Sequence, residues 1–139
     1  MTGKSLNAER VPSETLMFDN GFKPRRAPRG SVLIAFAQSD PTPILAGLSQ
    51  LATPLDVVVL DNGSDDSARA ERVTAEVARL ALPARFVRLA SRSARATTRN
   101  RLAREARAAR RLVLDADAPS DHLRSLRRWL AKAEAASVA

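Results

Sequence analysis

Two aspartates, Asp115 and Asp117, follow the apolar run 112–114 and are separated by a single residue. Alternate residues of an extended chain point to the same side, so both carboxylates can face one ligand. Carboxylate oxygens suit hard cations such as Mg²⁺ and Mn²⁺, which also bridge phosphates. The pair therefore predicts a site for a metal and a phosphorylated ligand. A solvated turn is the alternative, since a lone Asp-x-Asp occurs by chance in many loops.

Polar side chains also follow three other apolar runs of the chain. They include Gln38 after the first run, Asp61 at the start of the turn 61–66, and Arg92 in the segment 91–93. If all these runs are parallel strands, their ends converge on one rim, where carboxylates repel one another unless a cation or a donor joins them. The turn 61–66 has a plainer interpretation, in which Gly63 adopts a positive φ and Ser64 or Asp65 only caps a helix.

The apolar runs alternate with helical patterns, which favours an α/β fold. The expected strands are 31–36, 55–60, 85–89 and 112–114; the helical patterns follow Pro41, the turn 61–66, Ala94 and the capping candidates Ser120 and Asp121. This order predicts a three-layer α/β/α, Rossmann-like domain with about four mostly parallel strands. The run 85–89 alternates more and is expected nearer an edge. Ligands of such sheets bind beyond the carboxyl ends of the strands.

Composition indicates one domain, 31–139, preceded by a flexible arm, 1–30, that has no periodic pattern. The net charge of +8 favours anionic partners. We expect no specific nucleic-acid binding, because the chain has few aromatic side chains on which bases could stack. The absence of cysteine, of an apolar span and of a leader pattern fits a cytoplasmic protein, with peripheral contact to an anionic membrane as a further expectation.

The segments 31–38, 55–66, 98–100 and 112–117 together resemble the successive motifs of family 2 glycosyltransferases, which have the GT-A fold. The resemblance covers about 31–129. It implies a nucleotide-sugar-binding domain that transfers a sugar from a nucleoside-diphosphate sugar to an acceptor, with Mn²⁺ or Mg²⁺ as the usual cofactor.

The resemblance also implies roles for individual residues. Asp61 contacts the base, Arg99 lies on the nucleotide side of the cleft, and Asp115 faces the ribose or the sugar. Asp117, the second residue of the DxD motif, binds the metal that bridges the diphosphate. Gln38 stands at a binding position of the first motif, and Arg92 is a candidate partner for a phosphate.

The chain departs from the family pattern at several positions. It has Ala35 and Gln38 where the family has Pro and Asn, and Arg110 and Arg111 open the last expected strand. It ends one helix after the motif, so only the nucleotide-binding half of the domain is expected, no catalytic residue can be assigned, and a homo-oligomer or partner chain could complete the domain. The alternative function is a catalytically inactive module that binds a nucleotide or another protein.

Overall fold

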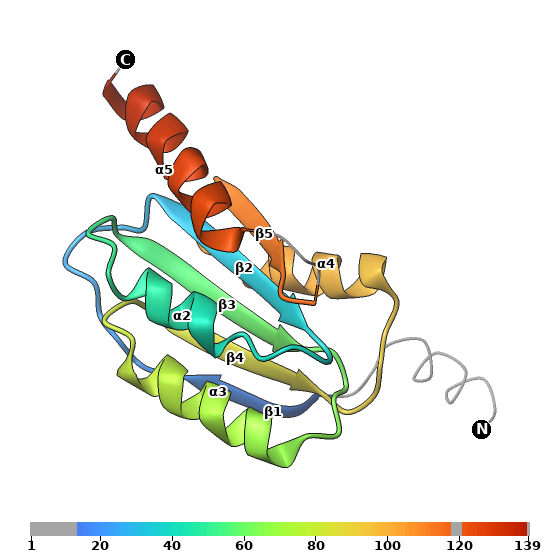
Figure 1. The fold of residues 1–139 in the computed structure, drawn as a ribbon. Coiled ribbons are helices and arrows are strands. Elements are labelled where there is room, and N and C mark those ends of the chain that lie inside the picture. Colours follow the sequence, from blue (N-terminus) through green and yellow to red (C-terminus); the bar gives the residue numbers. More distant parts are fainter. Residues whose placement is uncertain (1–13, 118–120, 139) are drawn as a thin grey trace.

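The structure is a computed structural model that describes residues 14–117 and 121–138. Strands and helices alternate along the chain after an initial strand (Figure 1). The elements are β1 (Glu14–Asp19), β2 (Gly30–Phe36), α2 (Thr42–Leu48), β3 (Leu55–Asp61), α3 (Ser67–Arg79), β4 (Ala84–Leu89), α4 (Arg95–Glu105), β5 (Arg111–Asp115) and α5 (His122–Val138).

The strands form one five-stranded sheet in the order β1-β4-β3-β2-β5. Four of them are parallel and correspond to the four predicted strands, whereas β1 runs antiparallel to β4. In the parallel register Phe36 lies opposite Asp61, and Ala35 lies opposite Asp115. The predicted convergence of the strand ends on one rim is therefore confirmed.

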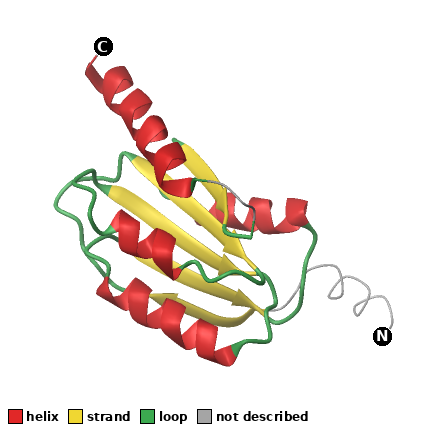
Figure 2. Ribbon diagram, viewed as in Figure 1, coloured by secondary structure: helices red, strands yellow, loops and turns green. Residues whose placement is uncertain are grey.

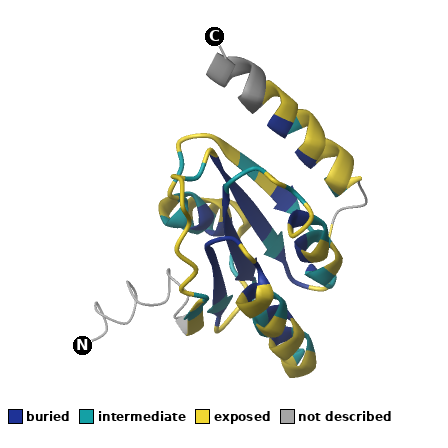
Figure 3. Ribbon diagram, turned by 90° about the vertical axis from the view of Figure 1, so that its left-hand side faces the viewer, coloured by how far each residue is buried: buried dark blue, intermediate teal, exposed yellow. Residues whose placement is uncertain are grey.

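Helices cover both faces of the sheet, which confirms the predicted Rossmann-like α/β/α class (Figure 2). On one face, alternate strand residues such as Ile34 and Val59 pack with α2, α3 and α5 in the larger core. On the other face, Leu33, Val58 and Val87 pack with Leu102 of α4 in a smaller core. Most of the described buried residues belong to the strands, and the outer helix faces are exposed (Figure 3).

Strand β1 lies inside the segment that the sequence predicted to be a flexible arm, so that prediction is wrong for Glu14–Asp19. This strand is hard to recognise because it pairs on one side only and leaves Leu16 and Met17 exposed. Phe18 packs against the larger core. Residues 1–13, the rest of the predicted arm before this strand, lie outside the described residues.

The two edges of the sheet also differ from expectation. Strand β4 is interior rather than near an edge, because β1 covers its outer side. The second edge is β5, and this position explains the unexpected Arg110 and Arg111, both of which are exposed.

The residues that cap the helices agree only in part with the sequence prediction. The side chain of Asp66, not that of Ser64 or Asp65, accepts the hydrogen bond from the Arg69 N–H at the start of α3. Asp121 accepts from the N–H of Arg124 as predicted, whereas Ser120 lies outside the described residues. No helix in the described part of the chain is long and apolar enough to cross a membrane.

Candidate functional site

The direction in which successive strands are added to the sheet reverses between β2 and β5. The carboxyl ends of these two strands form the switch point of the sheet. From β2 the chain adds β3 and then β4 on one side, and it then crosses by α4 to place β5 on the other side of β2. The connection before β5 runs through α4 over the face opposite to α2 and α3 (Figure 1). Such a switch point is the usual place for a ligand in an open α/β sheet.

A cavity of about 410 Å³ lies at this switch point, on the side of α4. Its volume is in the range of small-molecule sites. It forms here because Ala35 is small and because α4 contacts β2 and β3 but leaves Val113 of β5 exposed. The cavity is called the cleft below; its polar lining comes from Gln38, Asn62, Arg92, Ser93, Arg95, Thr98, Arg99, Asp115 and Asp117.

The Asp117 carboxylate accepts hydrogen bonds from the backbone of the loop after β2. The backbone N–H of Ala37 donates to Oδ2 at 3.0 Å, that of Ser39 donates to Oδ1 at 2.7 Å, and that of Gln38 lies 3.2 Å from both oxygens. Burial alone would raise the pKa of Asp117, but these backbone hydrogen bonds outweigh it and hold the pKa below its ordinary value. Asp117 therefore joins the β2 and β5 loops as an ionised acceptor.

The neighbouring carboxylate, Asp115, lies on the α4 side of the rim. Its Oδ1 accepts the hydrogen bond from the N–H of Asp117 at 3.0 Å, and its Oδ2 lies 3.9 Å from Nη2 of Arg95. The Asp115 side chain is 40% exposed and that of Arg95 is 76% exposed. This long, solvated ion pair contributes little to stability and can open for a ligand.

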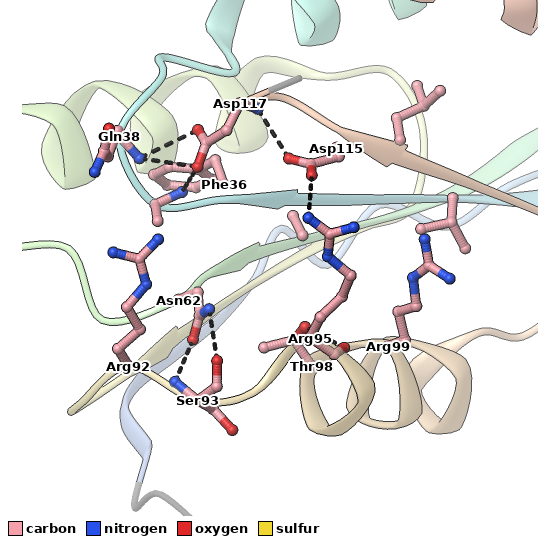
Figure 4. Close-up of a pocket in the computed structure, with 14 residues that line it drawn as sticks. Phe36, Gln38, Asn62, Arg92, Ser93, Arg95, Thr98, Arg99, Asp115 and Asp117 are labelled. Carbon is pink, nitrogen blue, oxygen red and sulfur yellow. Dashed lines mark hydrogen bonds and ion pairs between the residues drawn. The ribbon is translucent and has the colours of Figure 1, made fainter.

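Three arginines form the wall of the cleft opposite the two aspartates (Figure 4). Arg92 belongs to the loop after β4, and Arg95 and Arg99 lie four residues apart on one face of α4. Helix α4 begins at the cleft after Ala94, which has no side chain that could cap it. Its first N–H groups and the positive end of its dipole add to the preference for an anion.

The loop that carries Arg92 is positioned by the turn after β3. The Asn62 side chain donates to the carbonyl of Ser93 at 3.1 Å and accepts from the N–H of Ser93 at 2.8 Å. Gly63 has φ +72°, and a Cβ there would clash with the backbone of Ser91 and Arg92. The predicted positive φ of Gly63 is confirmed, and the close approach of the two loops is a second reason for glycine at this position.

Asp61 lies at the rim but not on the wall of the cleft. It is fully buried, and its carboxylate accepts from the N–H and the hydroxyl of Ser64 at 2.8 and 2.9 Å. Its Oδ2 also lies 3.5 Å from Nε of Arg88. The next residue, Asn62, faces the cleft instead. A base contact by Asp61 remains a prediction that would require this carboxylate to exchange its present partners.

The acidic residues of the cleft do not form a metal centre in the arrangement described. Among residues 14–117 and 121–138, no group of three or more His, Asp or Glu side chains is placed to hold a metal ion. Both oxygens of Asp117 face N–H donors, whereas Asp115 accepts one hydrogen bond, on Oδ1, and its Oδ2 has the 3.9 Å contact with Arg95. A divalent ion binds through such carboxylate oxygens, so Asp117 does not fit one unless it gives up its backbone hydrogen bonds.

Five of the six residues singled out in the sequence line the cleft: Gln38, Arg92, Arg99, Asp115 and Asp117. The sequence reasoning missed Arg95 and Asn62. Arg95 could have been found from its spacing, because it precedes Arg99 by one helical turn. The role of Asn62 depends on contact with a loop 31 residues away, which no local pattern indicates.

The histidine and the tryptophan of the chain both lie away from the cleft. His122 borders a smaller apolar cavity of about 190 Å³ between α2 and α5. Trp129 packs on Gly30 and on the larger core, so its indole serves packing. Comparisons of the chain with protein-family models, with curated proteins and with solved structures gave no match.

Proposed function

We propose that the cleft binds a nucleoside-diphosphate sugar. One observation carries this proposal: Gln38, Arg92, Arg99, Asp115 and Asp117, which come from three segments distant in sequence, line one cavity at the switch point of a parallel sheet. Guanidinium groups match the geometry and charge of phosphate oxygens, and carboxylates accept hydrogen bonds from sugar hydroxyls. The resemblance of the motif order to family 2 glycosyltransferases supports the same class of ligand.

Transfer of the sugar to an acceptor is the second part of the proposal. It rests on the resemblance alone, and no residue is assigned as a catalytic base. The divalent cation at Asp117, a partner that completes the domain, and a cytoplasmic location at an anionic membrane remain predictions from the sequence.

The second candidate function is an inactive nucleotide-binding module. The engagement of Asp117 by three backbone N–H groups favours it, because a carboxylate used to join two loops is not available for the chemistry of a leaving diphosphate. The two candidates share the binding step and differ only in turnover.

Calorimetry on the full chain tests the shared step. The ligands are uridine, guanosine, adenosine and cytidine diphosphates, their sugar conjugates, and inorganic pyrophosphate. At least one nucleotide is expected to bind more tightly than pyrophosphate, because the sugar and base add contacts that pyrophosphate lacks. The absence of binding by every nucleotide would overturn the proposal.

Asp115→Ala sharpens this test because it acts in opposite directions on the two ligand types. Removal of a negative charge beside Arg95 is expected to leave pyrophosphate binding equal or stronger. The same substitution is expected to weaken nucleotide-sugar binding by about tenfold, as the loss of a charged hydrogen bond to a hydroxyl does. Asp65→Ala, at an exposed position outside the cleft, controls for the change in charge.

A mass-spectrometric assay of the nucleotide sugars that bind then separates the two candidates. Release of the nucleoside diphosphate, by transfer or by hydrolysis, supports a glycosyltransferase. Binding without any release supports the inactive module.

A further inference from the structure

The positive charges of the cleft are available to a ligand, whereas the Asp117 carboxylate is already engaged by backbone N–H groups. Within the described residues, neither Arg92 nor Arg99 makes an ion pair, and Arg95 has only the 3.9 Å contact with Asp115. All three guanidinium groups extend across the cleft from the α4 side, toward the ends of β2 and β5 (Figure 4). The cleft therefore presents three exposed cations to an anion.

The opposite wall shows why a metal is not required for charge neutralisation. A divalent ion would have to displace the N–H of Ala37 and the N–H of Ser39 from the oxygens of Asp117, at 3.0 and 2.7 Å. It would also compete with Arg95 for Asp115. The backbone N–H groups already balance the Asp117 carboxylate, so a cation gains little by replacing them.

We propose that the cleft neutralises the diphosphate of its ligand with Arg92, Arg95 and Arg99, and that it does so without a divalent cation. Arg95 exchanges the Asp115 carboxylate for a phosphate oxygen, and Arg92 and Arg99 bind from the two sides of it. Asp117 keeps its backbone hydrogen bonds throughout and acts as a positioning residue for the loop after β2. This inference rests on the proposed function, because it names how the ligand of the same cleft is held.

The test compares nucleoside-diphosphate binding by the full chain in EDTA and in MnCl₂, with pyrophosphate in EDTA as a third arm. The affinity for the nucleotide is expected to agree within about twofold between EDTA and MnCl₂, since no metal contributes. Pyrophosphate binding in EDTA that matches the nucleotide would identify free diphosphate, rather than a nucleotide, as the ligand that the arginines hold.

Arg99→Ala and Arg104→Ala form a matched pair for the same measurement. Both arginines are exposed residues of α4 and both substitutions remove one positive charge, but only Arg99 lines the cleft. Arg99→Ala is expected to weaken binding in EDTA by about tenfold or more, the loss typical of a charge-assisted hydrogen bond. Arg104→Ala is expected to stay within about twofold of the unsubstituted chain.

Each outcome decides one proposal. Binding that needs Mn²⁺ and disappears in Asp117→Ala overturns the metal-free inference and leaves the proposed function standing. Equal weakening by Arg99→Ala and Arg104→Ala overturns the inference as well, because it indicates only a general positive field. No nucleotide binding in either buffer overturns the proposed function itself.

Discussion

On the sheet face covered by α4, an arginine lies near an aspartate at the amino ends of the strands and another such pair lies at the carboxyl ends. The two pairs differ in their exposure to solvent. At the amino ends of the strands, Asp56 is fully buried and the Arg85 side chain is 8% exposed. At the carboxyl ends, the side chains of Asp115 and Arg95 are 40% and 76% exposed. The same residue types are thus internal at one end and open to solvent at the other.

The buried end forms a hydrogen-bonded network that leaves Nε of Arg85 without a partner among the described residues. Arg85 donates to the Glu105 carboxylate at 2.7 Å and to the Glu105 carbonyl, and it lies 3.5 Å from Asp56. Asp56 accepts from the hydroxyl of Ser31 at 3.0 Å and from the N–H of Arg107 at 2.9 Å. The network fixes the end of α4 to the sheet, so the far end of the same helix can hold its arginines over the cleft.

The comparison shows that burial, not residue type, separates structural charge from charge that a ligand can use. A buried ion is costly unless its partners are all present, whereas an exposed ion pair contributes about 0–1 kcal/mol. The arginines of the cleft can therefore exchange partners at little cost, and Arg85 cannot.

The largest expected effect comes from Arg85→Ala, which leaves the buried Asp56 without its cation and Glu105 with Arg101 as its remaining ionic partner. Loss of one partner of a buried ion pair costs about 3–5 kcal/mol, and the change in the free energy of unfolding can be measured with urea. Arg95→Ala at the open end is the control and should cost less than about 1 kcal/mol. Equal losses for the two substitutions would remove the distinction between the ends.

Gly63→Ala is expected to have the next largest effect, because it disrupts the packing of the turn after β3 against the loop that carries Arg92. The positive φ and the clash with the backbone of Arg92 together should cost about 3 kcal/mol and weaken anion binding in the cleft.

Gly21→Ala is the matched control for Gly63→Ala. Gly21 also has a positive φ, of +69°, but a Cβ there meets no atom within 4 Å. Its substitution should therefore cost only about 1 kcal/mol and leave binding unchanged. If both glycine variants lose the same stability, the close approach of the two loops has no energetic weight.

The regular part of the fold could be predicted because each parallel strand is a compact apolar run bounded by turn residues. The pattern from Ser31 onward gave the strand order along the chain, and right-handed crossovers brought Asp61, Asp115 and Gln38 to one rim. Strand β1 was missed because it has only three apolar side chains, of which two, Leu16 and Met17, are exposed. An edge strand with one neighbour has a weak sequence signal.

The partners of the site residues could not be predicted, because they depend on loops that meet only in the folded chain. The sequence predicted Asp117 at the cleft but not that the backbone of Ala37 to Ser39 would occupy its oxygens. The sequence predicted Asp61 at the rim. It did not predict that Asp61 would be buried and would accept a hydrogen bond from the Ser64 hydroxyl. Residue types and spacing indicate which side chains converge, and contacts between loops decide which of them remain available.

The smallest expected effect concerns Asp117→Asn, which keeps the shape of the side chain and removes its charge. The amide would turn its own N–H donors toward those of the loop after β2, and the loss of this capping carboxylate should cost about 1 kcal/mol at neutral pH. The variant and the unsubstituted chain can be compared by thermal unfolding in EDTA across a series of pH values, with Asp65→Asn as a control for charge.

The pH dependence of that difference tests the role of Asp117 directly. The pKa of Asp117 is lower in the folded protein than its ordinary value, so the ionised carboxylate stabilises the fold at pH values above about 4. This contribution is lost as the pH falls below about 4 and through the folded pKa, and the stabilities of the protein and of Asp117→Asn should converge there. A difference that stays constant down to low pH would mean that the backbone N–H groups of the β2 loop do not hold a carboxylate in solution. Asp117 would then be free to pair with the arginines of the cleft, and these arginines would no longer be available to a ligand.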